Sequence, residues 1–380
     1  MTAPSITPFK VNIPPAAVSD LRERLSHARL PEKETVNDWT QGAPLDNVQA
    51  LIRHWRSGYD MQRLAKRLQA FPGYWTTLDG LGVHFLHVRS RHENAMPLIL
   101  THGWPGSIVE FLNVIGPLTD PTAHGGKAED AFHVVIPSLP GYGFSEKPGA
   151  KGWGLPRIAR AWGTLMQRLG YERYAAQGGD WGAGVTTWMA KQQLQGLAGI
   201  HLNLPLLFPP PVVGEPNDEE KASIAQLVAF GADKSGYAVL QSTRPQTLGY
   251  SLADSPVGQA AWIYEKLGEW SDSGHRPETV ISPDDMLDNI MLYWLTDTAA
   301  SSARLYAESF ATDFSPQKLD LPVAVSVFPG ELYRPLRVWG ERMYSNIIYW
   351  GEASRGGHFA AFEQPALFVQ ELRRGLRPLR

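Results

Sequence analysis

The sequence predicts an α/β protein with a mainly parallel central sheet, an inserted helical lid and an N-terminal helical arm. Three observations indicate this class. From 76–205, short apolar runs alternate with helical patterns of about 10 to 15 residues, which is typical of βαβ units. Residues 206–310 lose this rhythm and show helical patterns only, whereas 311–380 regain it. The first stretch, 1–75, has helical spacing and no apparent chemistry.

The N-terminal arm is predicted from the spacing of its large apolar residues. Leucines recur at near-helical intervals in 19–30, and Leu51, Trp55 and Leu64 do so in the next stretch. Pro72-Gly73 then ends that pattern. We expect 1–75 to pack on the lid and the core.

The predicted core elements follow in chain order. Residues 74–90 alternate in polarity around Asp79-Gly80, which indicates a hairpin. Further strands are predicted within 96–103, 132–141, 322–331 and 346–352, and 171–193 is predicted to run from a strand into a helix. The predicted helices are 107–120, 158–170 and 364–376 in the core, with 219–233, 257–270 and 284–310 in the lid.

Composition and charge exclude several classes of protein. With 35 Lys and Arg against 38 Asp and Glu, the net charge is −3, which argues against nucleic acid as a partner. The absence of cysteine excludes disulfides, thiolate nucleophiles and Cys-ligated metals, and no His-Glu-x-x-His pair is present. No run of about 18 apolar residues occurs, and the N-terminus resembles neither a signal peptide nor a membrane anchor. We therefore expect a cytoplasmic protein without a metal.

The most informative segment is GGDWGAG, residues 178–184, between a predicted strand and a predicted helix. Small residues surround Asp180, as a sharp strand-to-helix turn requires when it presents a strained central residue. The familiar form of this turn is G-x-S-x-G, and here Asp stands in place of Ser. A plain glycine turn with Asp180 as helix N-cap is the alternative.

Three further glycine-rich turns favour the catalytic interpretation. HGWPG at 102–106 follows an apolar strand, where an oxyanion-hole loop belongs, and GYGFS at 141–145 follows the next strand. His358 stands after two glycines near the C-terminus. The order of nucleophile, acid and His is that of α/β-hydrolases. Glu331 directly follows a predicted strand and is the preferred acid, with Glu341 and Glu352 as rivals.

These motifs resemble those of the epoxide hydrolases of the α/β-hydrolase superfamily, in the branch of the microsomal and juvenile-hormone enzymes with its N-terminal extension. The resemblance covers nearly the whole chain and rests on HGWPGS, GGDWGA, two lid segments at 235–263 and 291–309, and RGGHFAAFEQP. It implies roles for seven residues. These are Asp180 as nucleophile, His358 as base, Glu331 as the acid that orients the base, Tyr237 and Tyr306 as proton donors from the lid, and Trp104 and Trp181 as backbone N–H donors of an oxyanion hole.

The implied reaction adds water to an epoxide and gives a vicinal diol through an aspartyl ester. A carboxylate attacks without prior deprotonation, and phenols remain protonated at pH 7 and can donate to the opening ring. The expected partners are therefore a small apolar epoxide and water, with no cofactor. Relatives of this branch are often dimers, so a homodimer is possible. Detoxification and natural-product tailoring are both open as biological roles.

Two alternatives remain at this point. A haloalkane dehalogenase-like hydrolase also uses an Asp nucleophile, but such enzymes usually have Asn where this chain has Trp104, and lid tyrosines have no task there. An esterase is disfavoured because a Ser nucleophile is missing. A non-catalytic binding protein of the same fold would have lost part of the set Asp180, His358 and Glu331, and all three are present.

Overall fold

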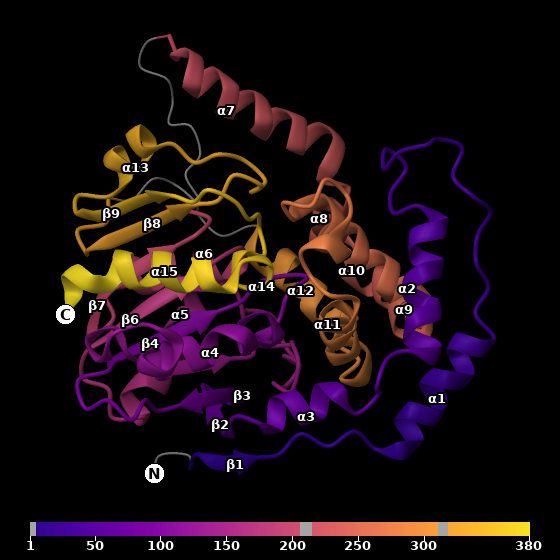
Figure 1. Cartoon of the computed structure of the whole chain (residues 1–380), viewed down its shortest axis with the longest axis horizontal. Helices are drawn as coiled ribbons and strands as arrows, with labels where there is room; N and C mark the ends of the chain where they lie inside the picture. Colours follow the sequence, from indigo (N-terminus) through magenta and orange to yellow (C-terminus); the bar gives the residue numbers. More distant parts are fainter. Residues whose placement is uncertain (1–4, 206–214, 311–317) are drawn as a thin grey trace.

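The computed structural model describes residues 5–205, 215–310 and 318–380. Within these ranges, nine strands form one sheet in the order β1-β2-β3-β5-β4-β6-β7-β8-β9 (Figure 1). Pairing is antiparallel from β1 to β5 and parallel from β5 to β9. The strands are β1 (Thr7–Phe9), β2 (Gly73–Leu78), β3 (Leu81–Val88), β4 (Met96–Thr101), β5 (Phe132–Pro137), β6 (Tyr174–Gly178), β7 (Leu197–Leu202), β8 (Val323–Val327) and β9 (Ile347–Glu352).

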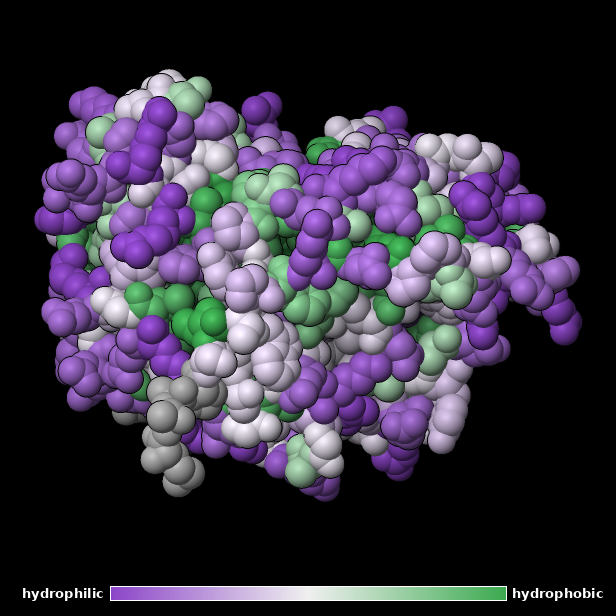
Figure 2. All heavy atoms as spheres, turned by 90° about the horizontal axis from the view of Figure 1, so that it is seen from below, coloured by the Kyte–Doolittle hydropathy of each residue, from purple (hydrophilic) through white to green (hydrophobic). Residues whose placement is uncertain are grey.

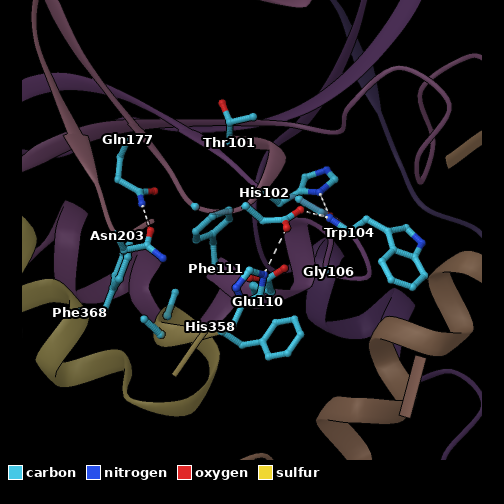
Figure 3. Close-up of a pocket in the computed structure, with 16 residues that line it drawn as sticks. Thr101, His102, Trp104, Gly106, Glu110, Phe111, Gln177, Asn203, His358 and Phe368 are labelled. Atoms are coloured by element: carbon cyan, nitrogen blue, oxygen red, sulfur yellow. Dashed lines mark hydrogen bonds and ion pairs between the residues drawn. The ribbon is translucent and has the colours of Figure 1, made fainter. Parts of the chain in front are cut away.

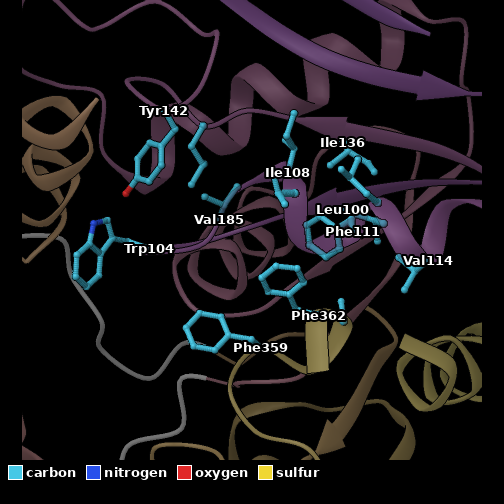
Figure 4. Packing of buried hydrophobic residues seen from close by; sticks show 14 of the residues in the cluster. Leu100, Trp104, Ile108, Phe111, Val114, Ile136, Tyr142, Val185, Phe359 and Phe362 are labelled. Carbon is cyan, nitrogen blue, oxygen red and sulfur yellow. The ribbon is translucent and has the colours of Figure 1, made fainter. Parts of the chain in front are cut away.

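Helices cover both faces of the sheet, as its largely apolar parallel strands require. One face carries α4 and α15, and the other carries α5 and α6 (Figure 1). The core helices are α4 (Leu112–Thr119), α5 (Leu155–Arg168), α6 (Trp181–Lys191), α13 (Arg337–Met343), α14 (Ala360–Glu363) and α15 (Pro365–Leu376). The main hydrophobic core runs from the sheet into the loops at its carboxyl edge, where Trp104, Tyr142 and Phe359 lie (Figure 4).

The β2–β3 hairpin confirms the turn predicted from Asp79-Gly80. Asp79 and Gly80 both have positive φ, 49° and 80°, and they connect strands paired from Leu78 to Leu81. Positive φ at both loop residues is the two-residue turn whose twist matches that of the flanking strands.

Six helices lie between β7 and β8, in the segment predicted as a lid, and the described part of that segment contains no strand of the sheet. They are α7 (Asp218–Ala229), α8 (Gly236–Thr243), α9 (Pro245–Asp254), α10 (Pro256–Trp270), α11 (Pro283–Leu295) and α12 (Ala299–Ser309). The pattern at 284–310 is two helices rather than one, because Asp297 turns the chain with φ of 49°. Helices α8 and α9 were not predicted.

The N-terminal arm corrects one prediction. It contains α1 (Pro15–Ser26), α2 (Leu45–Ser57) and α3 (Arg63–Gln69), but it also contributes β1 to the sheet edge. A three-residue strand has too few positions to show a period, which is why helical spacing alone was expected. The helices α1 and α2 contact α10, and α3 contacts α11, so the arm touches the lid (Figure 1).

Buried charges join the arm to the lid. Asp288 of α11 has no exposed side-chain surface, and it accepts hydrogen bonds from Tyr59, at 2.7 Å, and from both Arg63 and Arg67. The Arg67 guanidinium lies 2.7 Å from Asp288 and 2.6 Å from Asp285. An anion without water contact is tolerated only with such partners, so this cluster fixes α3 on α11.

The surface that Figure 2 shows is mainly hydrophilic, with hydrophobic side chains visible in a band across its middle. Among the described residues, no helix combines the length and the apolar character that crossing a membrane demands.

Candidate active site

Asp180 occupies a strained turn between β6 and α6. Its backbone has φ of 50° and ψ of −131°, outside the regions that most residues adopt. Only glycines fit around it. A Cβ on Gly178 would lie 2.1 Å from the carbonyl oxygen of Gly182, and a Cβ on Gly182 would lie 1.9 Å from that of Thr101. The carboxylate accepts no hydrogen bond from the first turn of α6, so Asp180 does not act as a side-chain N-cap.

His358 lies between two carboxylates. Its Nε2 is 3.3 Å from Oδ2 of Asp180, and its Nδ1 is 2.6 Å from Oε1 of Glu331 (Figure 3 shows the first contact). Glu331 follows β8, and the imidazole is only 5% exposed. A histidine held in this way has one nitrogen directed at each carboxylate.

The rival acids lie elsewhere. Glu341 on α13 pairs with Arg337 at 2.9 Å, and Glu352 at the end of β9 pairs with Arg334 at 3.0 Å. Both pairs are solvent-exposed. Of the three candidate acids, the structure therefore brings Glu331 to the imidazole.

The two carboxylates govern the charge of His358. Burial by itself would lower the pKa of the imidazole, but Glu331 and Asp180 outweigh it and hold the pKa well above its usual value. Part of that effect depends on the negative charge of Asp180. Neutralising Asp180 therefore lowers the pKa of His358 and favours the free base.

The other oxygen of the Asp180 carboxylate accepts a backbone hydrogen bond. The N–H of Trp104 donates to Oδ1 at 2.7 Å. Gly103 permits this approach, since a Cβ there would lie 2.0 Å from the same oxygen. Trp181 is the first residue of α6, and first-turn N–H groups have no acceptor within their own helix. The Trp104 N–H and the positive end of the helix favour negative charge at this carboxyl group.

Five aromatic rings stand above the carboxylate. Tyr237 of α8 stacks on Trp104 with ring centres 5.2 Å apart, and Tyr306 of α12 meets Trp181 edge to face at 4.7 Å. The two tyrosine rings are 5.8 Å apart, and Trp270 lies 5.0 Å from Tyr237. The lid therefore packs two phenol rings against the two tryptophans that flank Asp180 in the site.

Both phenols are strongly buried. Burial and the nearby Asp180 raise the pKa of Tyr237 and hold the pKa of Tyr306 well above the usual value. The hydroxyl of Tyr306 lies near the side chains of Tyr237 and Trp181 but makes no well-directed hydrogen bond with a described residue. Buried hydroxyls normally have a partner, so this O–H is available to a bound molecule with an acceptor atom.

Sequence reasoning missed the residues that hold the His358 loop. Glu363 of α14 accepts the backbone N–H groups of Gly357 at 3.0 Å and Phe359 at 2.9 Å, on both sides of the histidine. It also accepts the N–H of Asp272 from the lid at 2.8 Å. Glu363 lies within the RGGHFAAFEQP motif, and an acidic residue five positions after the histidine was the available signal.

A small cavity lies beneath these groups, lined by Asp180, His358 and the carboxyl-edge residues of β4 and β6 (Figure 3). It also contains Glu110, from the 3-10 helix η1 (Ile108–Phe111), which the sequence analysis did not select. No cluster of three His, Asp or Glu suited to a metal ion occurs in the part of the chain that the structure describes.

Family models match two parts of the chain. The epoxide hydrolase N terminus matches 6–111, and the alpha/beta hydrolase fold matches 96–236. A protein of Stigmatella aurantiaca named "Putative epoxide hydrolase" is 62% identical over 99% of this chain and 86% of that protein. Epoxide hydrolase 1 of Sus scrofa is 35% identical, over 97% of this chain and 88% of its own.

The chain belongs to the epoxide hydrolase family.

Solved structures agree with the predicted fold. The Aspergillus niger epoxide hydrolase has a TM-score of 0.89 at 32% identity and covers 99% of this chain and 97% of its own. The juvenile hormone epoxide hydrolase of the silkworm Bombyx mori has a TM-score of 0.88 at 28% identity, over 99% and 95% of the two chains. The α/β-hydrolase fold and the resemblance to epoxide hydrolases are thereby confirmed. The activity of this family is the conversion of an epoxide and water to a vicinal diol.

Proposed function

We propose that this epoxide hydrolase works through a covalent ester on Asp180, with the five side chains described above in the roles that the sequence suggested. The supporting observation is the environment of one carboxylate. His358 contacts one oxygen, the Trp104 N–H contacts the other, and the rings of Tyr237 and Tyr306 pack on Trp104 and Trp181 beside it. Each of these neighbours can act in a particular step of the same reaction.

In the first step, Asp180 attacks a ring carbon of the epoxide. The carbon–oxygen bond of the ring breaks, and the departing oxygen takes a proton from Tyr237 or Tyr306. Burial raises the pKa of both phenols, so they stay protonated at neutral pH and can donate. Two donors hold the oxygen from two sides. The product of this step is an ester with a neighbouring hydroxyl group.

In the second step, water attacks the carboxyl carbon of the Asp180 ester, and His358 accepts a proton from that water. Esterification removes the charge of Asp180 that helps to raise the pKa of His358, so the imidazole becomes a base when it is needed. Glu331 then stabilises the imidazolium. The N–H of Trp104, with that of Trp181 at the start of α6, stabilises the tetrahedral oxyanion by about 3 kcal/mol per donor.

The alternatives are not favoured. The Trp104 ring is stacked on Tyr237 at 5.2 Å, so this position contributes an aromatic wall for the lid donor. A dehalogenase has no use for two buried phenols, and a binding protein has no use for a histidine between two carboxylates.

A parallel assay tests the proposal. Styrene oxide, a chloroalkane and a nitrophenyl ester are each incubated with the wild-type protein and with Asp180→Ala. We expect diol from the epoxide with the wild type alone, and little product from the other two. Faster release of halide or nitrophenol than of diol would contradict the proposal, as would diol formation by Asp180→Ala.

The biological setting stays a prediction. Detoxification, natural-product tailoring, a cytoplasmic location and a homodimer are all expectations from the sequence. A panel of aryl and terpenoid epoxides with chiral analysis of the diols discriminates the first two, because a tailoring enzyme is expected to prefer one substrate and one enantiomer.

A further inference from the structure

Glu110 is a carboxylate within the catalytic cavity that the five proposed roles leave unused. It stands on η1 between Val109 and Phe111, which are both buried in the core. Its carboxylate folds over Gly106, since a Cβ built there would lie 1.3 Å from Oε1. Gly106 belongs to the HGWPG turn that also supplies the Trp104 N–H, so the turn brings Glu110 to the same site.

The cavity beside Glu110 has the size of a water site. The space open to the centre of a water molecule is about 20 Å³, and about 10–15 Å³ is enough for one water. Glu110, Asp180 and His358 all line it, and Phe111, Phe359 and Phe368 supply apolar walls (Figure 3). Because Asp180 and His358 both line this cavity, a water in it would be near the base and near the carboxyl carbon that the second step attacks.

Two other polar groups of the cavity support a water site. Oε1 of Gln177 and Oγ1 of Thr101 are buried and make no hydrogen bond with any described residue. Both residues line the cavity. Buried polar atoms of this kind are usually satisfied by ordered water.

We infer that Glu110 orients the hydrolytic water and accepts its second proton. The inference rests on the proposed ester mechanism. One O–H of the water donates to Nε2 of His358 and the other to the Glu110 carboxylate, so the oxygen lone pair faces the ester carbon. With His358 as the only acceptor, one O–H of the water has no fixed partner and the water can rotate. A second acceptor at Glu110 prevents this rotation.

The second proton of the water also needs an acceptor. The attacking water loses one proton to His358, which returns it to the leaving alkoxide as the ester bond breaks. The second proton remains on the Asp180 carboxylic acid and must leave before the next cycle. Glu110 takes it, and the anionic Asp180 is restored. After the next ring opening Glu110 releases that proton to solvent, from which the tyrosine that protonated the ring oxygen recovers its own.

The electrostatics of Glu110 make its proposed role depend on pH. Burial is the main cause that raises its pKa to about 8, with smaller raising effects of Asp180 and Glu363, against lowering effects of His358 and the Ser107 amide. In the free enzyme Glu110 is therefore mainly protonated at neutral pH. The carboxylate must form before Glu110 can hold the water, so its contribution to ester hydrolysis should grow as the pH rises through this range.

The test separates the two chemical steps in Glu110→Gln, whose amide keeps the shape but cannot take a proton. We expect ring opening within about threefold of wild type and ester hydrolysis slowed by about 10- to 100-fold, so that the ester accumulates in intact-protein mass spectra. Asp130→Asn is the matched control. It removes another buried carboxylate, which pairs with Arg377 at 2.8 Å, and both steps should be unchanged.

The pH dependence of ester hydrolysis distinguishes a role in proton transfer from a purely structural role, because a structural role would leave that dependence unchanged. Ester hydrolysis in the wild type requires both neutral His358 and ionised Glu110. A plot of the logarithm of its rate against pH should therefore have a slope of about two at low pH, whereas the plot for Glu110→Gln should have a slope of about one. If Glu110→Gln does not fold, Glu110→Asp should hydrolyse the ester slowly but keep the slope of two.

Three results would overturn or redirect the inference. Hydrolysis in Glu110→Gln at the wild-type rate and slope removes the role of Glu110. If both steps slow equally and the melting temperature falls, Glu110 has a structural role, and this result also overturns the inference. Absence of any ester in the wild type contradicts the proposed mechanism itself and is distinct from both.

Discussion

The backbone N–H of His358 donates to the carbonyl oxygen of Trp270 at 2.9 Å. The candidate base is thus hydrogen-bonded to the lid helix α10, whose Trp270 ring also lies 5.1 Å from the imidazole. Asp272 extends this connection, because its carboxylate accepts the N–H of Gly356 at 2.9 Å. Lid and base are therefore positioned together.

Removing the Asp272 carboxylate should loosen the base. In Asp272→Ala the Gly356 N–H loses a charged acceptor, a contact typically worth about 1.5–3 kcal/mol. We expect ester hydrolysis to slow more than ring opening, and the free energy of unfolding to fall by an amount in that range. Rapid-quench kinetics measure the rates of the two steps, and urea unfolding measures the free energy of unfolding. Asp218→Ala, at an exposed carboxylate, is the control, and equal behaviour of the two variants would contradict the coupling.

The lid tyrosines should act as partly redundant acids. Tyr237→Phe or Tyr306→Phe removes one O–H donor while the other remains, so ring opening should slow by about tenfold in each. The double variant should lose about 10³- to 10⁴-fold, more than the single losses combined. Single-turnover alkylation rates test this. A double variant with the wild-type rate would show that the phenols do not protonate the ring oxygen.

His358→Gln should stop the reaction after its first step. Ring opening needs no base, because the Asp180 carboxylate is already ionised at neutral pH. The ester then persists, since water lacks a proton acceptor. Intact-protein mass spectrometry should show an increase equal to the mass of the epoxide, located by digestion on the peptide containing Asp180. An unmodified variant that still turns over would be inconsistent with this role.

The cluster between arm and lid should contribute to stability. Replacing both Arg63 and Arg67 by Met leaves Asp288 buried without a cation, which typically costs about 3–5 kcal/mol. Adding Asp288→Asn removes that buried charge and should restore part of the loss. Chemical unfolding measures both changes. A double variant within about 1 kcal/mol of wild type would mean that the cluster does not hold α3 on α11.

Local patterns in the sequence predicted much of the fold. The Asp79-Gly80 hairpin and the turn at Asp180 each depend on a backbone conformation that only a few residue types tolerate, so the residues themselves identify them. The three-residue β1 and the short helices α8 and α9 were missed because they span too few residues for a hydrophobic period.

The site was harder to predict from the residues alone. His358 and Asp180 stand in glycine-rich turns that mark them, whereas Tyr237 and Tyr306 lie on ordinary helical stretches and were selected only by family resemblance. The contacts of Glu363 with Asp272 join positions 91 residues apart. Glu110 reaches the cavity only because Gly106 leaves room for it. Such relationships arise from tertiary packing and have no local sequence pattern.

The origin of the added oxygen tests the covalent role of Asp180 most directly. A single turnover in heavy-oxygen water with excess enzyme should give mostly unlabelled diol, because the first product takes its oxygen from the Asp180 carboxylate. The label should appear in the peptide that contains Asp180, since water attacks the carboxyl carbon. Fully labelled diol in the first turnover, with no label in that peptide, would mean that water opens the ring directly and would contradict the ester mechanism.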